Sequence, residues 1–257
     1  MFRSPSRAPA GILARTEIIV GIGRIAEASF PIRSPRSVKK PIYYLVLLWT
    51  GVGALGQEPA GGLAADEALA KLMAGNRRYA RHQQQHPDQS LARRKELEKG
   101  QHPFAVILGC ADSRVAPELL FDQGLGDLFV IRVAGNIVDD AVLGSIEYAV
   151  EHLGTKLIMV LGHEKCGAIS AAIDGGVAPG HIQGLVAAIE PSVKASGKEP
   201  GDRVHNCVIA NARRVARQIR ESEPVLKEFA EHHGVEVVAA DYALDSGKVN
   251  LLDFNRP

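Results

Sequence analysis

Two cysteines and one histidine, Cys110, Cys166 and His163, have the side-chain types and the spacing that suit a single zinc ion. Cys110 follows an apolar run at residues 104–108 with one glycine between them, and His163 follows a similar run at residues 157–161 in the same way. Two thiolates and an imidazole form a borderline-soft donor set that zinc prefers, and three protein ligands leave one tetrahedral position open, as catalytic zinc requires. The pattern therefore predicts a catalytic zinc site, against the alternative of three ordinary core residues.

A carboxylate and a guanidinium group come soon after the first of these ligands. Asp112 and Arg114 lie two and four residues after Cys110. A carboxylate so close to zinc could fill the open position or accept a hydrogen bond there, and Arg114 would keep it ionised by bidentate pairing. The same residues could also be a surface ion pair, or Asp112 or Ser113 could cap a helix. The spacing alone does not separate these alternatives.

The elements that must position these residues follow from the alternation of apolar runs with helical patterns. Three continuous apolar runs are expected to be strands, at residues 104–108, 128–133 and 157–161. Residues 235–240 predict a fourth strand, and residues 248–252 follow a turn and predict an antiparallel edge strand. Such runs between helices indicate a mostly parallel sheet that is covered on both faces. The expected fold is α/β, with about four parallel strands, one antiparallel edge strand and flanking helices.

The expected sheet also explains why the ligands should meet. In open α/β sheets, functional sites lie in the crevice beyond the carboxyl ends of the strands. Before the first strand, residues 64–100 are helical in character but carry few apolar residues, so we expect a helical arm that packs on something else, such as a partner subunit. Residues 57–257 are expected to form a single domain.

The charge of the chain is divided unequally. Residues 1–56 carry eight Lys or Arg and two Glu, a net charge of +6, and the whole chain is at +1, which leaves −5 for residues 57–257. A mildly acidic folded part argues against a nucleic-acid-binding surface.

Residues 38–56 have the pattern of a secretory signal peptide, because two lysines precede an apolar run and small residues follow it up to Gly56. The run is short for a membrane span, which needs about 20 residues, although an uncleaved anchor is the alternative. Residues 1–37 are either an over-extended start or an organellar transit sequence. We therefore expect export to the periplasm after cleavage near Gly56, with no stable membrane insertion afterwards; organellar targeting is the alternative.

Three cysteines cannot close a disulfide framework within the chain. With two of them assigned to metal, Cys207 remains, within a helical pattern at residues 203–221. We expect a buried structural cysteine there rather than a reactive thiol.

Two motifs together resemble the paired signatures of the β-class carbonic anhydrases. They are Cys110-x-Asp112-Ser113-Arg114 and His163-x-x-Cys166-Gly167. The similarity extends from about Asp66 to the end of the chain and includes residues 75–79, 126–132, 134–136 and 147–149. The resemblance implies a zinc lyase with one Zn²⁺ per subunit that interconverts carbon dioxide and bicarbonate. It also implies a homodimer or a higher oligomer built on a dimer.

The resemblance assigns roles to the site residues. It implies that Cys110, His163 and Cys166 ligate zinc and that Asp112 is a gatekeeper carboxylate. In an open state Arg114 holds Asp112 off the metal, and in a closed state Asp112 ligates zinc and blocks the reaction.

Two further positions indicate a subtype. Gln101 lies nine residues before Cys110, where plant-like members of the family have a glutamine that hydrogen-bonds the substrate oxygen. Members with a regulatory bicarbonate pocket have tryptophan three residues before the cysteine, and this chain has Ile107 there. We therefore expect the plant-like (type I) subtype, in which the gate stands open.

Two alternative functions stay open. The same site could hydrolyse carbon disulfide or carbonyl sulfide, or the protein could be a non-catalytic, zinc-stabilised bicarbonate-binding protein. The combination of Gln101, Asp112 and Arg114 argues against the second, since a structural zinc site does not need them. The residue that carries the proton away from the site is not identified by the sequence.

Overall fold

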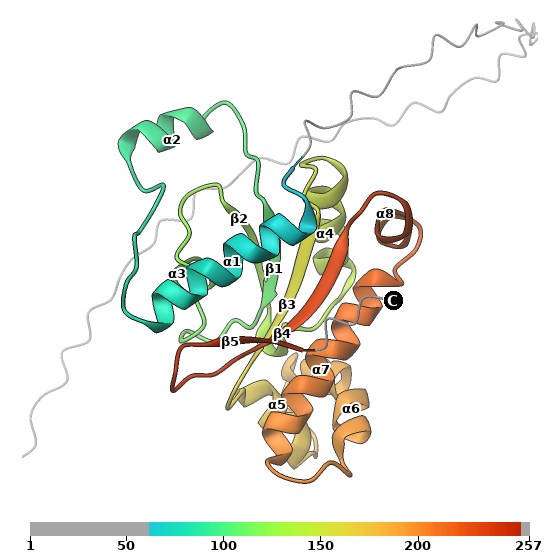
Figure 1. Ribbon diagram of the computed structural model, residues 1–257. Coiled ribbons are helices and arrows are strands. Elements are labelled where there is room, and N and C mark those ends of the chain that lie inside the picture. Colours follow the sequence, from blue (N-terminus) through green and yellow to red (C-terminus); the bar gives the residue numbers. More distant parts are fainter. Residues whose placement is uncertain (1–61, 253–257) are drawn as a thin grey trace, which may run out of the picture. The chain divides into compact units, whose positions relative to one another are not determined.

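The structure is a computed structural model, and it describes residues 62–252 (Figure 1). The predicted signal peptide at residues 38–56 and the segment at residues 1–37 lie outside the described residues. Within residues 62–252, no helix has the length and apolar content needed to cross a membrane.

One five-stranded sheet forms the centre of the fold, in the order β2-β1-β3-β4-β5. The strands are β1 (Ala105–Gly109), β2 (Leu128–Arg132), β3 (Leu157–His163), β4 (Glu236–Tyr242) and β5 (Val249–Leu252). The first four are parallel, and β5 is antiparallel to β4. The predicted α/β fold, with four parallel strands and an antiparallel edge strand, is confirmed. Both β3 and β4 run two residues further than predicted, so that β3 ends on His163.

The central strands β1 and β3 are continuous apolar runs because both of their faces are covered. Alternate residues point to opposite faces. Ile107 and Met159 join the apolar cluster under α1 (Ala65–Ala80) and α3 (Pro117–Leu120). Val106 and Val160 join the cluster on the other face. That face is covered by α4 (Asp140–Glu151), α7 (Arg203–Arg220) and α8 (Val225–His232).

The predicted helical arm at residues 64–100 consists of two helices that differ in burial. Ala68 and Leu72 of α1 are completely buried. The expectation that the arm buries little by itself is therefore wrong for α1, because its apolar stripe packs on its own sheet. The second helix, α2 (Leu91–Leu97), has no buried residue, and Figure 1 shows it standing apart from the sheet.

A third apolar cluster closes the carboxyl end of the sheet. It is formed by α5 (Gly167–Asp174), α6 (Ile182–Ser196), part of α7 and the short 3-10 turn η1 (Ala134–Asn136). Helix α6 continues through Pro191 and ends at Ser196. Cys110 and Cys166 belong to this cluster, so the predicted ligands are enclosed by helices of their own chain.

Candidate metal centre

The three predicted ligands lie together at the carboxyl ends of two neighbouring strands. Cys110 directly follows β1, His163 is the last residue of β3, and Cys166 immediately precedes α5. Because β1 and β3 are paired and parallel, their carboxyl ends meet at the same edge of the sheet. The two sulfur atoms and a ring nitrogen lie within 4.8 Å of one another, and all three residues are buried.

The geometry of these donors fits a zinc ion. Cys110 Sγ lies 4.0 Å from Cys166 Sγ. Two sulfur atoms bound to one zinc at 2.3 Å with a tetrahedral angle would be about 3.8 Å apart. His163 Nδ1 lies 2.8 Å from the carbonyl oxygen of Glu164, which can only accept, so Nδ1 carries the proton. The lone pair is then on Nε2, which is buried without a hydrogen-bond partner. A carbonyl on one ring nitrogen and a metal on the other is the usual arrangement of a metal-binding histidine.

The two thiols are close enough to share one negative charge. A hydrogen bond from Cys166 lowers the pKa of the Cys110 thiol to about 4 against the opposing effect of burial, with further help from His163 and the amide of Gly135. Ionised Cys110 in turn raises the pKa of Cys166, and burial adds to this effect. A bound cation of charge +2 favours the thiolate form of both residues. The two thiols and the imidazole are therefore suited to bind a divalent cation.

A backbone amide supports the first ligand. Gly135 N donates to Cys110 Sγ over 3.3 Å. Gly135 has a φ of 73°, and a Cβ atom there would lie 2.7 Å from Ile189 Cδ1. Only glycine fits this conformation and this space without strain. Sequence reasoning used residues 134–136 only for the family resemblance and did not place Gly135 at the metal centre.

The predicted gate lies beside the ligands. Arg114 Nε and Nη2 donate to the two carboxylate oxygens of Asp112 over 2.9 and 2.7 Å, and the Arg114 amide donates to the same carboxylate. These hydrogen bonds hold the pKa of Asp112 well below its usual range. Asp112 Oδ2 is 3.9 Å from His163 Nε2. The carboxylate therefore lies next to the ligand atoms while it is paired with Arg114.

Arg132, at the end of β2, holds the loop that carries a predicted ligand, Cys110, and the predicted gate residue, Asp112. Its Nε donates to the carbonyl oxygen of Cys110 over 3.0 Å, and its Nη2 donates to that of Asp112 over 2.6 Å. Sequence reasoning missed this role. The available signal was a charged residue at the end of an apolar strand, close to where the ligands were expected.

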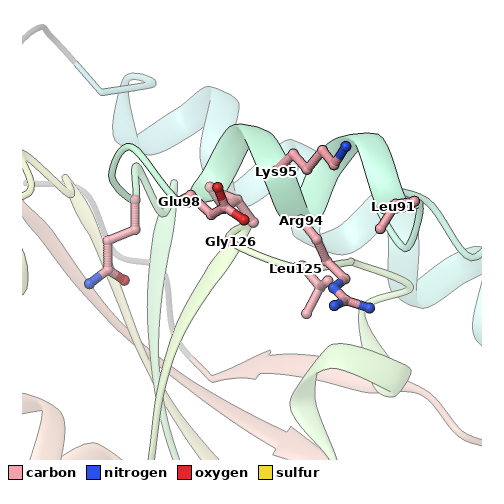
Figure 2. A pocket seen from close by; sticks show the side chains of 8 residues that line it. Leu91, Arg94, Lys95, Glu98, Leu125 and Gly126 are labelled. Carbon is pink, nitrogen blue, oxygen red and sulfur yellow. The ribbon is translucent and has the colours of Figure 1, made fainter.

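Gln101 lies away from these residues within the same chain. It precedes β1, whereas Cys110 follows β1, and a strand of five residues spans about 17 Å. Gln101 is exposed, and with residues of α2 and with Leu125 and Gly126 it lines an open hollow of about 710 Å³ (Figure 2). The structure thus brings the predicted ligands and the predicted gate together at the carboxyl ends of the strands. Gln101 lies at the opposite, amino end of β1.

The two remaining predicted positions are both buried. Ile107 is completely buried in β1. Cys207 is also completely buried, in α7, and burial raises the pKa of its thiol. The prediction of a buried rather than a reactive cysteine is confirmed.

Comparison with known proteins agrees with this site. A family model described as carbonic anhydrase matches residues 105–249. Carbonic anhydrase 2 of Mycobacterium tuberculosis is 42% identical over 190 residues, which cover 72% of this chain and 92% of that protein. A tetrameric β-carbonic anhydrase of Sordaria macrospora is similar in structure, with a TM-score of 0.60 and 25% identity over 74% of this chain and 100% of that chain. A Coccomyxa β-carbonic anhydrase in complex with acetazolamide has a TM-score of 0.56 and 26% identity over 72% of this chain and 86% of that one. The chain belongs to the carbonic anhydrase family, and to its β class.

Proposed function

We propose that this protein is a zinc enzyme that catalyses the reversible hydration of carbon dioxide to bicarbonate and a proton. The observation that carries the proposal is the buried set of Cys110, His163 and Cys166 with a paired carboxylate next to it, in a chain of the carbonic anhydrase family. Zinc bound there would act as a Lewis acid and lower the pKa of a coordinated water to about 7. A hydroxide that can attack carbon dioxide would then be available near neutral pH.

The other residues of the site have separate roles in binding the metal and orienting water. Cys110, His163 and Cys166 would hold the metal as its protein ligands. Asp112, kept ionised by Arg114, can only accept hydrogen bonds, so it would accept one from a water molecule beside the predicted ligands and thereby orient that water toward the substrate. Arg132 fixes the backbone on which this geometry depends.

The proposed gate stands open in the plant-like manner. Both oxygens of Asp112 are occupied by Arg114, which keeps the carboxylate from turning to the metal. The buried Ile107 at the position of the regulatory tryptophan supports the same subtype. A crystal structure at neutral pH with Asp112 bound directly to zinc would contradict it.

The proposed role of Gln101 requires a second copy of the chain. Gln101 is at the far end of β1 from its own metal centre, so a contact with substrate can be made only in the site of another subunit. Two features support a homodimer, or a higher oligomer built on one. The edge strand β2 is apolar but only partly buried, and such edges are normally covered. The hollow around Gln101 is lined by exposed side chains, including Leu91 and Leu125 (Figure 2).

Export to the periplasm remains our proposal from the sequence, with cleavage near Gly56. Mass spectrometry of the mature protein gives the decisive measurement. A mature chain that begins near Gln57 is expected, and one that begins far upstream would contradict the proposed cleavage.

Stopped-flow hydration of carbon dioxide, followed with a pH indicator, tests the proposed reaction. The wild-type protein loaded with zinc should hydrate carbon dioxide, and Cys110→Ala should show no rate above that of buffer. Release of sulfide from carbon disulfide or carbonyl sulfide, without hydration of carbon dioxide, would favour the hydrolase alternative instead. Zinc binding with neither reaction would favour a bicarbonate-binding protein.

A further inference from the structure

A buried asparagine connects α7 to the backbone that supports the metal centre. Asn211 is 1% exposed, and its Nδ2 donates to the carbonyl oxygen of Gly135 over 2.9 Å. The amide of the same glycine donates to Cys110 Sγ. One glycine Cα therefore joins a peptide group held by Asn211 to a peptide group that contacts a metal ligand.

The orientation of the Asn211 amide is determined by its other partners. Its Oδ1 accepts from Ser192 Oγ over 3.0 Å and from Arg214 Nη2 over 3.1 Å. A guanidinium group has no acceptor, so the atom that faces Arg214 must be the oxygen. The atom that faces Gly135 is then the nitrogen, and it can only donate.

Arg214 is the origin of this chain of hydrogen bonds. Its Nε donates to Ser192 Oγ and its Nη2 donates to the carbonyl oxygen of Ala188, both over 2.7 Å. Burial lowers the pKa of Arg214. From Arg214 through Ser192 and Asn211 to Gly135, each group donates in the same direction. Such chains polarise one another, so the charge of Arg214 strengthens the bond to Gly135.

A glycine at this position needs such support. Glycine adopts both signs of φ readily, so its own conformational preference does not hold the peptide of Gly135 in place. The contact with Ile189 leaves no room for a side chain that would restrict it. The hydrogen bond from Asn211 therefore restricts the orientation of the Gly135 peptide, which a side chain would restrict at a residue other than glycine.

We propose that Asn211 is a positioning residue of the metal centre, which orients Gly135 so that its amide donates to the Cys110 thiolate. The inference rests on the proposed zinc site and adds to it a residue 101 positions along the chain from the ligand that it affects. The hydrogen bond to sulfur fixes the ligand and withdraws part of its charge. Loss of a hydrogen-bond partner of a metal ligand typically lowers metal affinity by 10- to 100-fold.

Asn211→Asp is the sharpest variant, because it keeps the shape of the side chain. Arg214 keeps the new carboxylate ionised, and the carboxylate still accepts from Ser192 and Arg214, but it cannot donate to Gly135. Asn76→Asp is the matched control. Asn76 is 3% exposed and also bridges backbone groups, those of Leu120, Gly247 and Val249, none of which is a metal ligand.

Three measurements separate positioning from general stability. Zinc affinity is measured by competition with a chromophoric chelator, the thiolate-to-metal absorption is recorded on the Co²⁺-substituted protein, and thermal unfolding is followed on the metal-free protein. For Asn211→Asp we expect zinc affinity roughly tenfold lower or more. We also expect the cobalt charge-transfer band at longer wavelength, since sulfur without its hydrogen bond donates electrons more easily. Asn76→Asp should lower thermal stability and leave zinc affinity and the cobalt band unchanged.

An Asn211→Asp protein with the wild-type zinc affinity and cobalt band overturns the inference, and so does an equal change in Asn76→Asp. If Asn211→Asp does not fold, Ser192→Ala is measured instead, because it removes one hydrogen-bond partner of Asn211 Oδ1. It should shift the cobalt band in the same direction as Asn211→Asp, by a smaller amount. An unchanged band in Ser192→Ala then overturns the inference. The wild-type protein is titrated first, and failure to bind zinc at that stage would refute the zinc site itself rather than the role of Asn211.

Discussion

The two ends of β1 differ in how completely one chain builds them. At the carboxyl end, the predicted ligands are buried, and their supporting hydrogen bonds are made with Gly135, Arg132 and Glu164 of the same chain. At the amino end, Gln101 and α2 are exposed around an open hollow, although the family resemblance assigns Gln101 to the substrate.

This difference indicates where the function depends on assembly. Metal binding needs only contacts within one chain, so a single subunit should bind zinc. Turnover in the proposed form also needs Gln101 from a second subunit. Metal affinity and turnover should therefore respond differently to changes at the two ends.

Asp112→Ala is expected to have the largest effect among variants that keep the metal. The variant loses the acceptor beside the metal and should lower kcat/KM by about 10³-fold, within the range for a positioned acid or base group. Bound zinc, measured by elemental analysis, should stay at one per subunit. Loss of the metal instead would show that Asp112 is itself a ligand and that the carboxyl end is built differently.

Gln101→Ala tests whether the amino end serves another subunit. Loss of a hydrogen-bond donor to a developing oxyanion typically costs 10²- to 10³-fold, and we expect about 10²-fold in kcat/KM with no loss of zinc.

Mixed dimers of Gln101→Ala and Asp112→Ala subunits sharpen this test. If Gln101 acts across subunits, one site of each mixed dimer contains both intact residues, and mixing the two inactive proteins should restore activity. No restoration after exchange of subunits would show that Gln101 acts within its own chain or not at all.

Leu91→Asp tests whether a second copy covers the hollow. Leu91 is 63% exposed in the described chain, and a charge in a buried interface should weaken association by about tenfold or more. Sedimentation velocity over a range of concentrations measures this effect. Val177→Asp is the control, because Val177 is 97% exposed and does not line the hollow. Equal association of both variants with wild type would remove the hollow from the interface.

Asp122→Asn should have the smallest effect, on the stability of the segment that leads to α2. Asp122 is almost fully buried; burial alone would raise its pKa, but hydrogen bonds from Gln85 and His86 and pairing with Arg78 outweigh burial and lower it. A lowered pKa means that the carboxylate stabilises the fold fully above its unfolded pKa, about 3.9, and loses this effect as the pH falls through the folded pKa.

The difference in unfolding free energy between wild type and Asp122→Asn should therefore be about 2 kcal/mol at pH 7 and smaller at pH 3. Urea unfolding of the metal-free proteins at both pH values gives this comparison. The exposed Asp88→Asn should differ from wild type by about 0.5 kcal/mol or less at pH 7. A difference for Asp122→Asn that does not change with pH would mean that charge is not the cause.

The sequence by itself determined the parallel sheet, the three candidate ligands and the neighbouring Asp112–Arg114 pair. These follow from local patterns: apolar runs give strands, parallel strands meet at their carboxyl ends, and an aspartate two residues before an arginine lies within reach of its guanidinium group. The family resemblance then supplied the reaction, which the local patterns alone did not.

Only the tertiary structure determined which residues far apart in the sequence contact the site and which residues near it in the sequence do not. Gln101 lies only nine positions before Cys110, yet the extended strand β1 places the two residues at opposite ends of the parallel strands. Conversely, Asn211 is 76 residues from Gly135 and contacts it, because α7 packs over the carboxyl end of the sheet. Hydrogen bonds between side chains and distant backbone groups leave no periodic pattern in a sequence. The hydrogen bonds of Arg132, Gly135 and Asn211 around the predicted metal centre are therefore set by the tertiary structure and not by a local pattern.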